Sequence, residues 1–193
     1  MRYGAAMDSR ATASTMPTEL ARLPRWALSH GRAADDADAA FAAGIALNCL
    51  DNLVRTAPAW AGCWRARQAL DCATAAVRLM GRHETQADLR DALLFTAPGD
   101  DSGPAGRLVL AFQTLAGRTR TVGSKAVEDL AGLMGLRIDG LSAVVDSFDE
   151  GLQSGRAAPF AVADLVARVC VVRPDAELLA WWLADRLLAE KLG

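Results

Sequence analysis

The 193-residue sequence contains little of what usually carries catalysis or nucleic-acid binding. It holds only two histidines, four cysteines and one tyrosine, and lysine occurs only at Lys125 and Lys191. The formal net charge is −2, so there is no basic surplus to neutralise a phosphate backbone. We therefore do not expect nucleic-acid binding, although arginines gathered on one face would still permit it.

The cysteines and histidines are not spaced as metal ligands or redox pairs. No Cys-x-x-Cys pair occurs, and each cysteine falls in an apolar helical pattern. The four are Cys49, Cys63, Cys72 and Cys170. His30 and His83 are too isolated to complete a zinc site with them. We expect free thiols in a reducing cytoplasm, with no metal and no cofactor.

Long hydrophobic runs are also missing. The longest uncharged stretch, Ala39–Leu50, is too short to span a bilayer, so no membrane association is expected. The N-terminus lacks the continuous apolar core of a secretory signal. Residues 1–33 are interpreted as a mobile leader that contains one short helix, and residues 34–193 as one helical domain.

Apolar residues repeat at spacings of three and four along most of the chain, which is the pattern of helices with one apolar side. Hydrophobic residues make up 52% of the sequence, enough for a packed core, and Pro and Gly separate the repeats. The predicted helices cover about residues 35–55, 59–80, 84–96, 104–115, 124–134, 141–153, 159–172 and 174–192. We predict an all-α fold, an irregular or orthogonal bundle of seven to eight short amphipathic helices.

The first predicted helix has a polar stripe opposite its apolar seam. Asp51 and Arg55 lie in this stripe, one turn apart, where they form an ion pair on the helix surface. We interpret the stripe as a solvated face. The apolar seam, which runs from Ala39 to Leu53, is expected to pack on other helices.

A glycine-rich segment and a pair of tryptophans resemble ligand-binding features, but each has a simpler interpretation. The segment 97–107 is rich in glycine, yet it lacks Gly-Lys-Ser/Thr, and Asp100 and Asp101 would repel a phosphate. We interpret it as a turn between helices. Trp60 and Trp64 lie one turn apart at the start of the second helix. They either stack on a ligand or, as is commoner, anchor one helix on another.

Asp185 is the residue that breaks the helical pattern. Its neighbours three and four positions away are Trp181, Trp182, Leu188 and Ala189, all apolar. We expect a buried carboxylate, which must be paired, reach solvent or have a raised pKa. Three interpretations stay open: an ion pair with an arginine of another helix, a catalytic or ligand-binding carboxylate, or a face exposed because its partner is missing.

The helix that carries Asp185 is apolar on nearly all sides and needs cover on two of them. Trp181, Leu188 and Leu192 line one of these sides, and the sequence ends directly after them. We treat these three residues and Trp182 as a candidate pocket or interface. A protein partner or self-association through this helix is expected, because exposed apolar patches usually mark interfaces.

Five segments stand out together: residues 24–27, 38–44, 60–64, 98–107 and 173–185. The most specific parts are Pro98-Gly-Asp-Asp101 and Trp181-Trp-Leu-Ala-Asp185. These segments resemble a bacterial family catalogued only as domain of unknown function number fourteen hundred and three. The resemblance implies a chain that continues past Gly193 with further helices, so the helical domain is expected to be incomplete at its C-terminus. It implies no activity, cofactor or site residues.

These patterns predict a non-catalytic cytoplasmic interaction or regulatory module, because no nucleophile constellation occurs and the histidines are far apart. The alternative is a small-ligand-binding protein or enzyme whose interhelical pocket includes Asp185, an arginine and Trp181 or Trp182. A deep cavity with those residues favours the alternative, whereas a filled core beside an exposed apolar patch favours the module.

Overall fold

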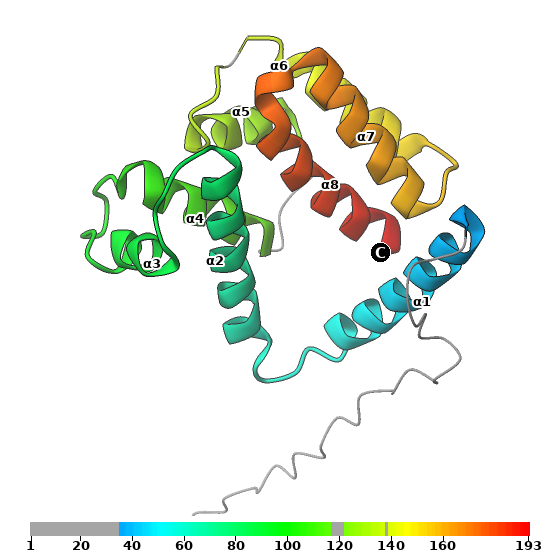
Figure 1. Ribbon diagram of the computed structural model, residues 1–193, viewed down its shortest axis with the longest axis horizontal. Coiled ribbons are helices and arrows are strands. Elements are labelled where there is room, and N and C mark those ends of the chain that lie inside the picture. The colour runs from blue at the N-terminus through cyan, green and yellow to red at the C-terminus, as the bar shows by residue number, and fades with distance from the viewer. Residues whose placement is uncertain (1–34, 117–121, 138) are drawn as a thin grey trace, which may run out of the picture.

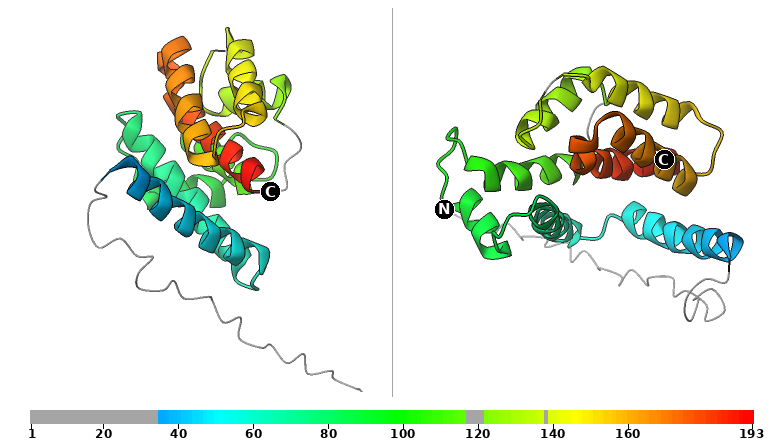
Figure 2. Two further views of the ribbon diagram at one scale, coloured as in Figure 1. Left: turned by 90° about the vertical axis from the view of Figure 1, so that its right-hand side faces the viewer. Right: turned by 45° about the horizontal axis from the view of Figure 1, so that its top comes forward.

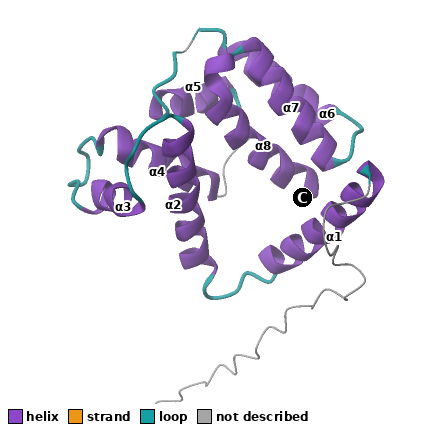
Figure 3. Cartoon of the chain, in the orientation of Figure 1, coloured by secondary structure: helices purple, strands orange, loops and turns teal. Residues whose placement is uncertain are grey.

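The computed structural model describes residues 35–116, 122–137 and 139–193. These residues form eight α-helices and no strand, and 78% of them are helical, which confirms the all-α prediction (Figure 3). The helices are α1 (Asp36–Arg55), α2 (Ala61–Leu79), α3 (Gln86–Leu94), α4 (Gly103–Ala116), α5 (Ser124–Leu133), α6 (Leu141–Gln153), α7 (Ala158–Val172) and α8 (Glu177–Leu192). A 3-10 turn, η2 (Pro174–Ala176), precedes α8. The predicted N-terminal leader lies outside the described residues.

Local signals in the sequence position several helix ends. The carboxylate of Asp35 caps α1 by accepting a hydrogen bond from the Asp38 N–H at 2.8 Å. Thr85 and Asp88 form a reciprocal capping box at the start of α3. Pro159 lies in the first turn of α7, where its missing N–H costs no helical hydrogen bond. These caps explain why helix positions are readable from the sequence.

The helices from α2 onward pack in two groups that meet where α4 contacts α5 and α8 (Figure 1). One group consists of α2, α3 and α4, and the other of α5, α6 and α7. The last helix packs along α7 and also contacts α6 and α4, so it belongs to both groups. Its buried residues are Leu179, Ala180, Trp182, Leu183, Ala184 and Leu187. Helix α8 therefore forms the centre of the core.

Two close contacts connect α8 to its neighbours. The indole N–H of Trp182 donates to the carbonyl of Ala111 in α4 at 2.9 Å, inside the core. Gly151 of α6 is buried against Leu187, and a Cβ at this glycine would lie 2.9 Å from the Leu187 Cδ2 atom. This contact explains a glycine in the middle of a helix, because α6 approaches α8 closely only without a side chain there.

Helix α1 departs from the prediction, because its apolar seam is not packed. None of its residues is buried, and Leu50 and Val54 are 42% and 52% exposed. Several seam positions are alanine, which offers little apolar area to drive packing. The loop to α2 includes Ala57 at φ 42°, a conformation that non-glycine residues rarely adopt. Beyond this loop α1 lies at the edge of the molecule (Figures 1 and 2).

The end of α1 is nevertheless tied to the end of α8. The Arg55 guanidinium donates from Nη2 to the carbonyls of Leu192 and Gly193, both at 3.2 Å. Its Nε donates to the Asp51 carboxylate at 2.7 Å, as the helical spacing predicts. These hydrogen bonds connect the last turn of α1 to the last two residues of the chain.

The two adjacent tryptophans of α8 should differ sharply in their contribution to stability. Trp182 is 2% exposed and Trp181 is 48% exposed. We expect Trp182→Ala to lower the free energy of unfolding by about 3–5 kcal/mol, because it leaves a cavity in the core. The matched variant Trp181→Ala should lose less than about 1 kcal/mol. Urea unfolding followed by circular dichroism measures both, and equal losses would contradict this division of the helix.

Candidate functional site

Two apolar depressions lie next to each other between the end of α1, α2, α4 and α8, and we call them together the apolar groove. One end, of about 40 Å³, lies between Leu53, Val54 and Trp60. The other end, of about 240 Å³, lies between Gln68, Ala69, Cys72, Phe112, Leu115 and Asp185. Trp64 and Arg65 line both depressions, so the two are neighbours.

Trp60 and Trp64 form the middle of the groove. Their rings meet edge to face, with centroids 6.3 Å apart and planes at 88°. Trp60 is 47% exposed, so the pair presents aromatic surface to solvent. The sequence placed both rings on one side of α2 and left open whether they anchor a helix or a ligand. Within the described residues they anchor each other and leave an open face.

Asp185 lies on the wall of the groove, and its expected burial is corrected. The residue as a whole is exposed, and its carboxylate forms no hydrogen bond or ion pair with the described residues. Of the three interpretations, the ion pair with an arginine is not found among the described residues, where Arg65 lines the same groove without pairing with Asp185. The physical reason is that α2 does not pack closely on this side of α8, so water enters between them.

The apolar wall changes the ionisation of both acidic groups in the groove. Partial removal of water raises the pKa of Asp185, because the charged carboxylate is less well solvated there. The pKa of the Cys72 thiol is raised mainly by burial and also by the negative charge of Asp185. A raised pKa keeps Cys72 protonated and unreactive, which argues against a nucleophilic role for this thiol.

The other candidate residues of α8 are separated by the fold. Trp182 is a core residue that lines neither end of the apolar groove, which corrects its assignment as a surface site residue. Trp181 is exposed, and its indole N–H donates to the Glu177 carboxylate at 3.3 Å. Leu188 and Leu192 are half-buried. None of these four lines the groove beside Asp185, where the tryptophan is Trp64 of α2.

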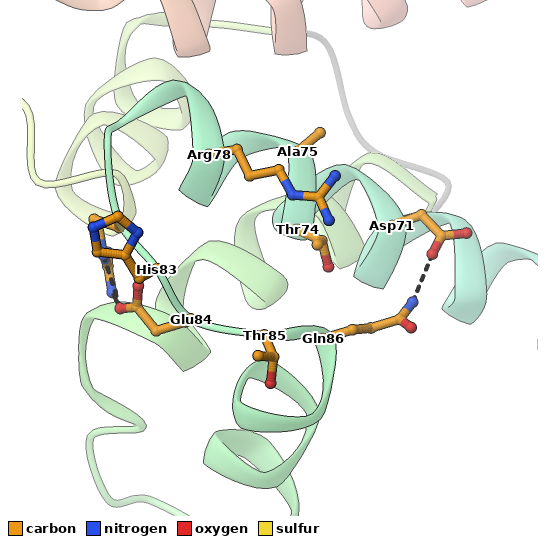
Figure 4. A pocket seen from close by; sticks show the side chains of 9 residues that line it. Asp71, Thr74, Ala75, Arg78, His83, Glu84, Thr85 and Gln86 are labelled. Carbon is orange, nitrogen blue, oxygen red and sulfur yellow. Dashed lines mark hydrogen bonds and ion pairs between the residues drawn. The ribbon is translucent and has the colours of Figure 1, made fainter.

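A second depression, which we call the polar pocket, lies between α2 and residues 82–86 (Figure 4). Its volume is about 570 Å³. The Gln86 amide donates to the Asp71 carboxylate at 2.6 Å and closes one end. Arg82 pairs with Glu84 and lowers the pKa of that carboxyl. The sequence did not reveal this pocket, because its second wall forms only when the chain folds back after α2.

The described residues were also compared with the requirements of a metal site and of a membrane-spanning helix. No group of three or more His, Cys, Asp or Glu residues lies close enough there to hold a metal ion. One helix, α1, is long and apolar enough to cross a membrane by length and composition alone. One such helix is weak evidence for a membrane span, because core helices and N-terminal signal sequences have the same length and composition.

The raised pKa of Asp185 predicts a pH-dependent gain from its removal. The folded chain binds the proton more tightly than the unfolded chain, so ionisation costs stability as the pH rises above the ordinary value of about 3.9. We expect Asp185→Asn to raise Tm by about 1–2 °C at neutral pH, a gain that shrinks as the pH falls towards about 4. Differential scanning calorimetry measures this, with Asp146→Asn on the exposed side of α6 as control. A gain independent of pH would contradict the assignment.

Comparison with known proteins places the chain in one family. The family described as "Protein of unknown function (DUF1403)" matches residues 11–193. No curated protein and no solved structure matches the chain. The resemblance carried by the Pro98–Asp101 and Trp181–Asp185 segments is thereby confirmed. Because the match covers almost the whole sequence, the protein belongs to the DUF1403 family.

Proposed function

We propose that this protein is a non-catalytic helical interaction module that binds a second copy of itself through α1 and the apolar groove. The observation that carries the proposal is that α1, a helix of 20 residues, buries none of its side chains. A helix with an apolar seam gains stability chiefly by packing that seam, so α1 lacks its main source of stabilisation within one chain.

The exposed side of α1 continues directly into the groove. Leu53 and Val54 line the groove's first end, and Trp60, Trp64 and Phe112 extend the apolar surface towards α8. Burial of one large apolar side chain is worth roughly 1.5–3 kcal/mol. The core beside this surface is apolar, and it holds no buried charged or polar residue among those described. An apolar core beside an exposed apolar surface is the pattern expected of an interaction module.

Charge favours a second copy as the occupant. Helix α1 begins with Asp35, Asp36 and Asp38 and ends with Arg55. Arg55 is paired with Asp51 and adds little net charge to its end of the helix. Two α1 helices packed antiparallel about a twofold axis keep their acidic starts apart, whereas a parallel pair brings them together. Their helix dipoles are then also opposed, which favours the same arrangement.

A second candidate function is small-ligand binding at the wide end of the groove. The observation in its favour is that Asp185, Arg65 and Trp64 meet there, which is the combination expected of a ligand pocket. The volume of about 240 Å³ is below the usual range for ligand sites, and the depression is open to solvent. The interaction module therefore has the stronger support.

Self-association is measured by analytical ultracentrifugation across a range of concentrations. We expect a monomer–dimer equilibrium, and we expect Leu50→Glu or Val54→Glu to weaken the dimer at least about tenfold, because each introduces a charge into the apolar contact. Asn48→Glu, which adds the same charge on the polar stripe of α1, is the matched control and should dimerise like the unmodified chain.

Three outcomes would overturn the proposal. One is a monomer at every concentration, and another is a dimer that Leu50→Glu and Asn48→Glu affect equally. The third is a monomer that floats with anionic phospholipid vesicles and loses that binding on Val54→Glu. This last result would assign α1 to a lipid surface, a reading that its length and apolar composition allow.

A further inference from the structure

The polar pocket contains two opposite charges that do not neutralise each other. Asp71 and Arg78 lie on one side of α2, two helical turns apart, a separation of about 10 Å along the axis. Asp71 accepts a hydrogen bond from Gln86 but forms no ion pair, and Arg78 has no hydrogen bond or ion pair with the described residues. The pocket thus has a negative end and a positive end.

The space between these charges is open because the residues between them are small. Thr74 and Ala75 form the floor, and the Thr74 hydroxyl donates to the Leu70 carbonyl at 2.8 Å, so its oxygen faces the pocket only as an acceptor. Figure 4 shows the Arg78 guanidinium between Ala75 and Thr74, extended towards the Asp71–Gln86 pair at the far end. A longer side chain at either floor position would fill the gap.

The remaining charged residues of the pocket are already paired. Arg82 binds Glu84 through Nε at 2.8 Å, which cancels both charges. The Thr85 hydroxyl is engaged by Asp88 in the cap of α3, at 2.7 Å. Of the carboxylates and guanidinium groups that line the pocket, Asp71 and Arg78 are therefore the two that form no ion pair, and the His83 ring also lines it.

We propose that the polar pocket binds a small zwitterion, an amino acid or short peptide with a free amino group and a free carboxylate. The Arg78 guanidinium binds the carboxylate through two parallel N–H donors, a geometry that arginine presents in a fixed fork. The Asp71 carboxylate and the Gln86 side-chain carbonyl accept hydrogen bonds from the ammonium. A simple anion is repelled by Asp71, and a simple cation is repelled by Arg78.

This site is distinct from the proposed dimer interface, because no residue of the polar pocket lines the apolar groove. Failure of one proposal therefore leaves the other standing. The two are separated in experiment by a dimer-disrupting variant such as Leu50→Glu, which should bind the zwitterion with unchanged affinity.

The test is a nuclear magnetic resonance titration of the full chain with three probes: glycylglycine, acetate and methylamine. We expect saturable shifts of the backbone amides of Thr74, Arg78 and Gln86 with glycylglycine, at a millimolar Kd, and at least about tenfold weaker binding of the other two probes. Arg78→Ala and Asp71→Asn should each weaken glycylglycine binding at least about tenfold, because each removes a charge-assisted contact.

The matched control is Arg67→Ala, which removes the same charge from α2 at an exposed position outside the pocket. It should bind glycylglycine like the unmodified chain, and circular dichroism confirms that each variant stays folded. The proposal is overturned if no probe gives saturable shifts or if acetate or methylamine binds as tightly as glycylglycine. Equal effects of Arg78→Ala and Arg67→Ala would also overturn it.

Discussion

The burial of α8 is the constraint on which the rest of the structure depends. This helix is apolar on nearly all sides, so no single neighbour can cover it. Helices α6 and α7 cover one part of it and α4 another, and the Trp182 indole bonds the Ala111 carbonyl across that second contact. The glycine at position 151 allows the closest approach. The two groups of helices are held together by the contact of α4 with α8 and by the contact of α4 with α5.

The side of α8 that these helices leave uncovered forms one wall of the apolar groove. Helix α2 stands off from α8, and the space between them is the apolar groove with Asp185 on its wall. The raised pKa of Asp185 and the exposed Trp60–Trp64 pair have the same origin, which is incomplete cover. Helix α1 lines the far end of the groove with Leu53 and Val54 and bonds the end of α8 through Arg55, but most of its apolar seam stays open. The surface proposed for binding therefore adjoins a part of the core that the described residues leave uncovered.

The candidate site was only partly predictable from the sequence. The helical pattern identified Asp185 as out of place and Trp181 as incompletely covered, because both statements depend on neighbours within one helix. The pattern did not predict which of Trp181 and Trp182 is buried, because a helix that is apolar on all sides gives no indication of which side faces the core. Trp64 and Arg65 reach the Asp185 wall from a helix more than 100 residues earlier, a proximity that no local spacing encodes.

The sequence by itself determined the helices, their approximate ends and the all-α class, together with the family. Caps such as Asp35 and Thr85, prolines in first turns and the three-and-four spacing act within a few residues, so they are readable without the fold. The tertiary structure alone decided which apolar sides are buried, that α1 is left unpacked, and that Asp71 and Arg78 share a pocket with the segment after α2. The physical reason is that burial depends on contacts between helices that are distant in sequence, and local spacing does not specify those contacts.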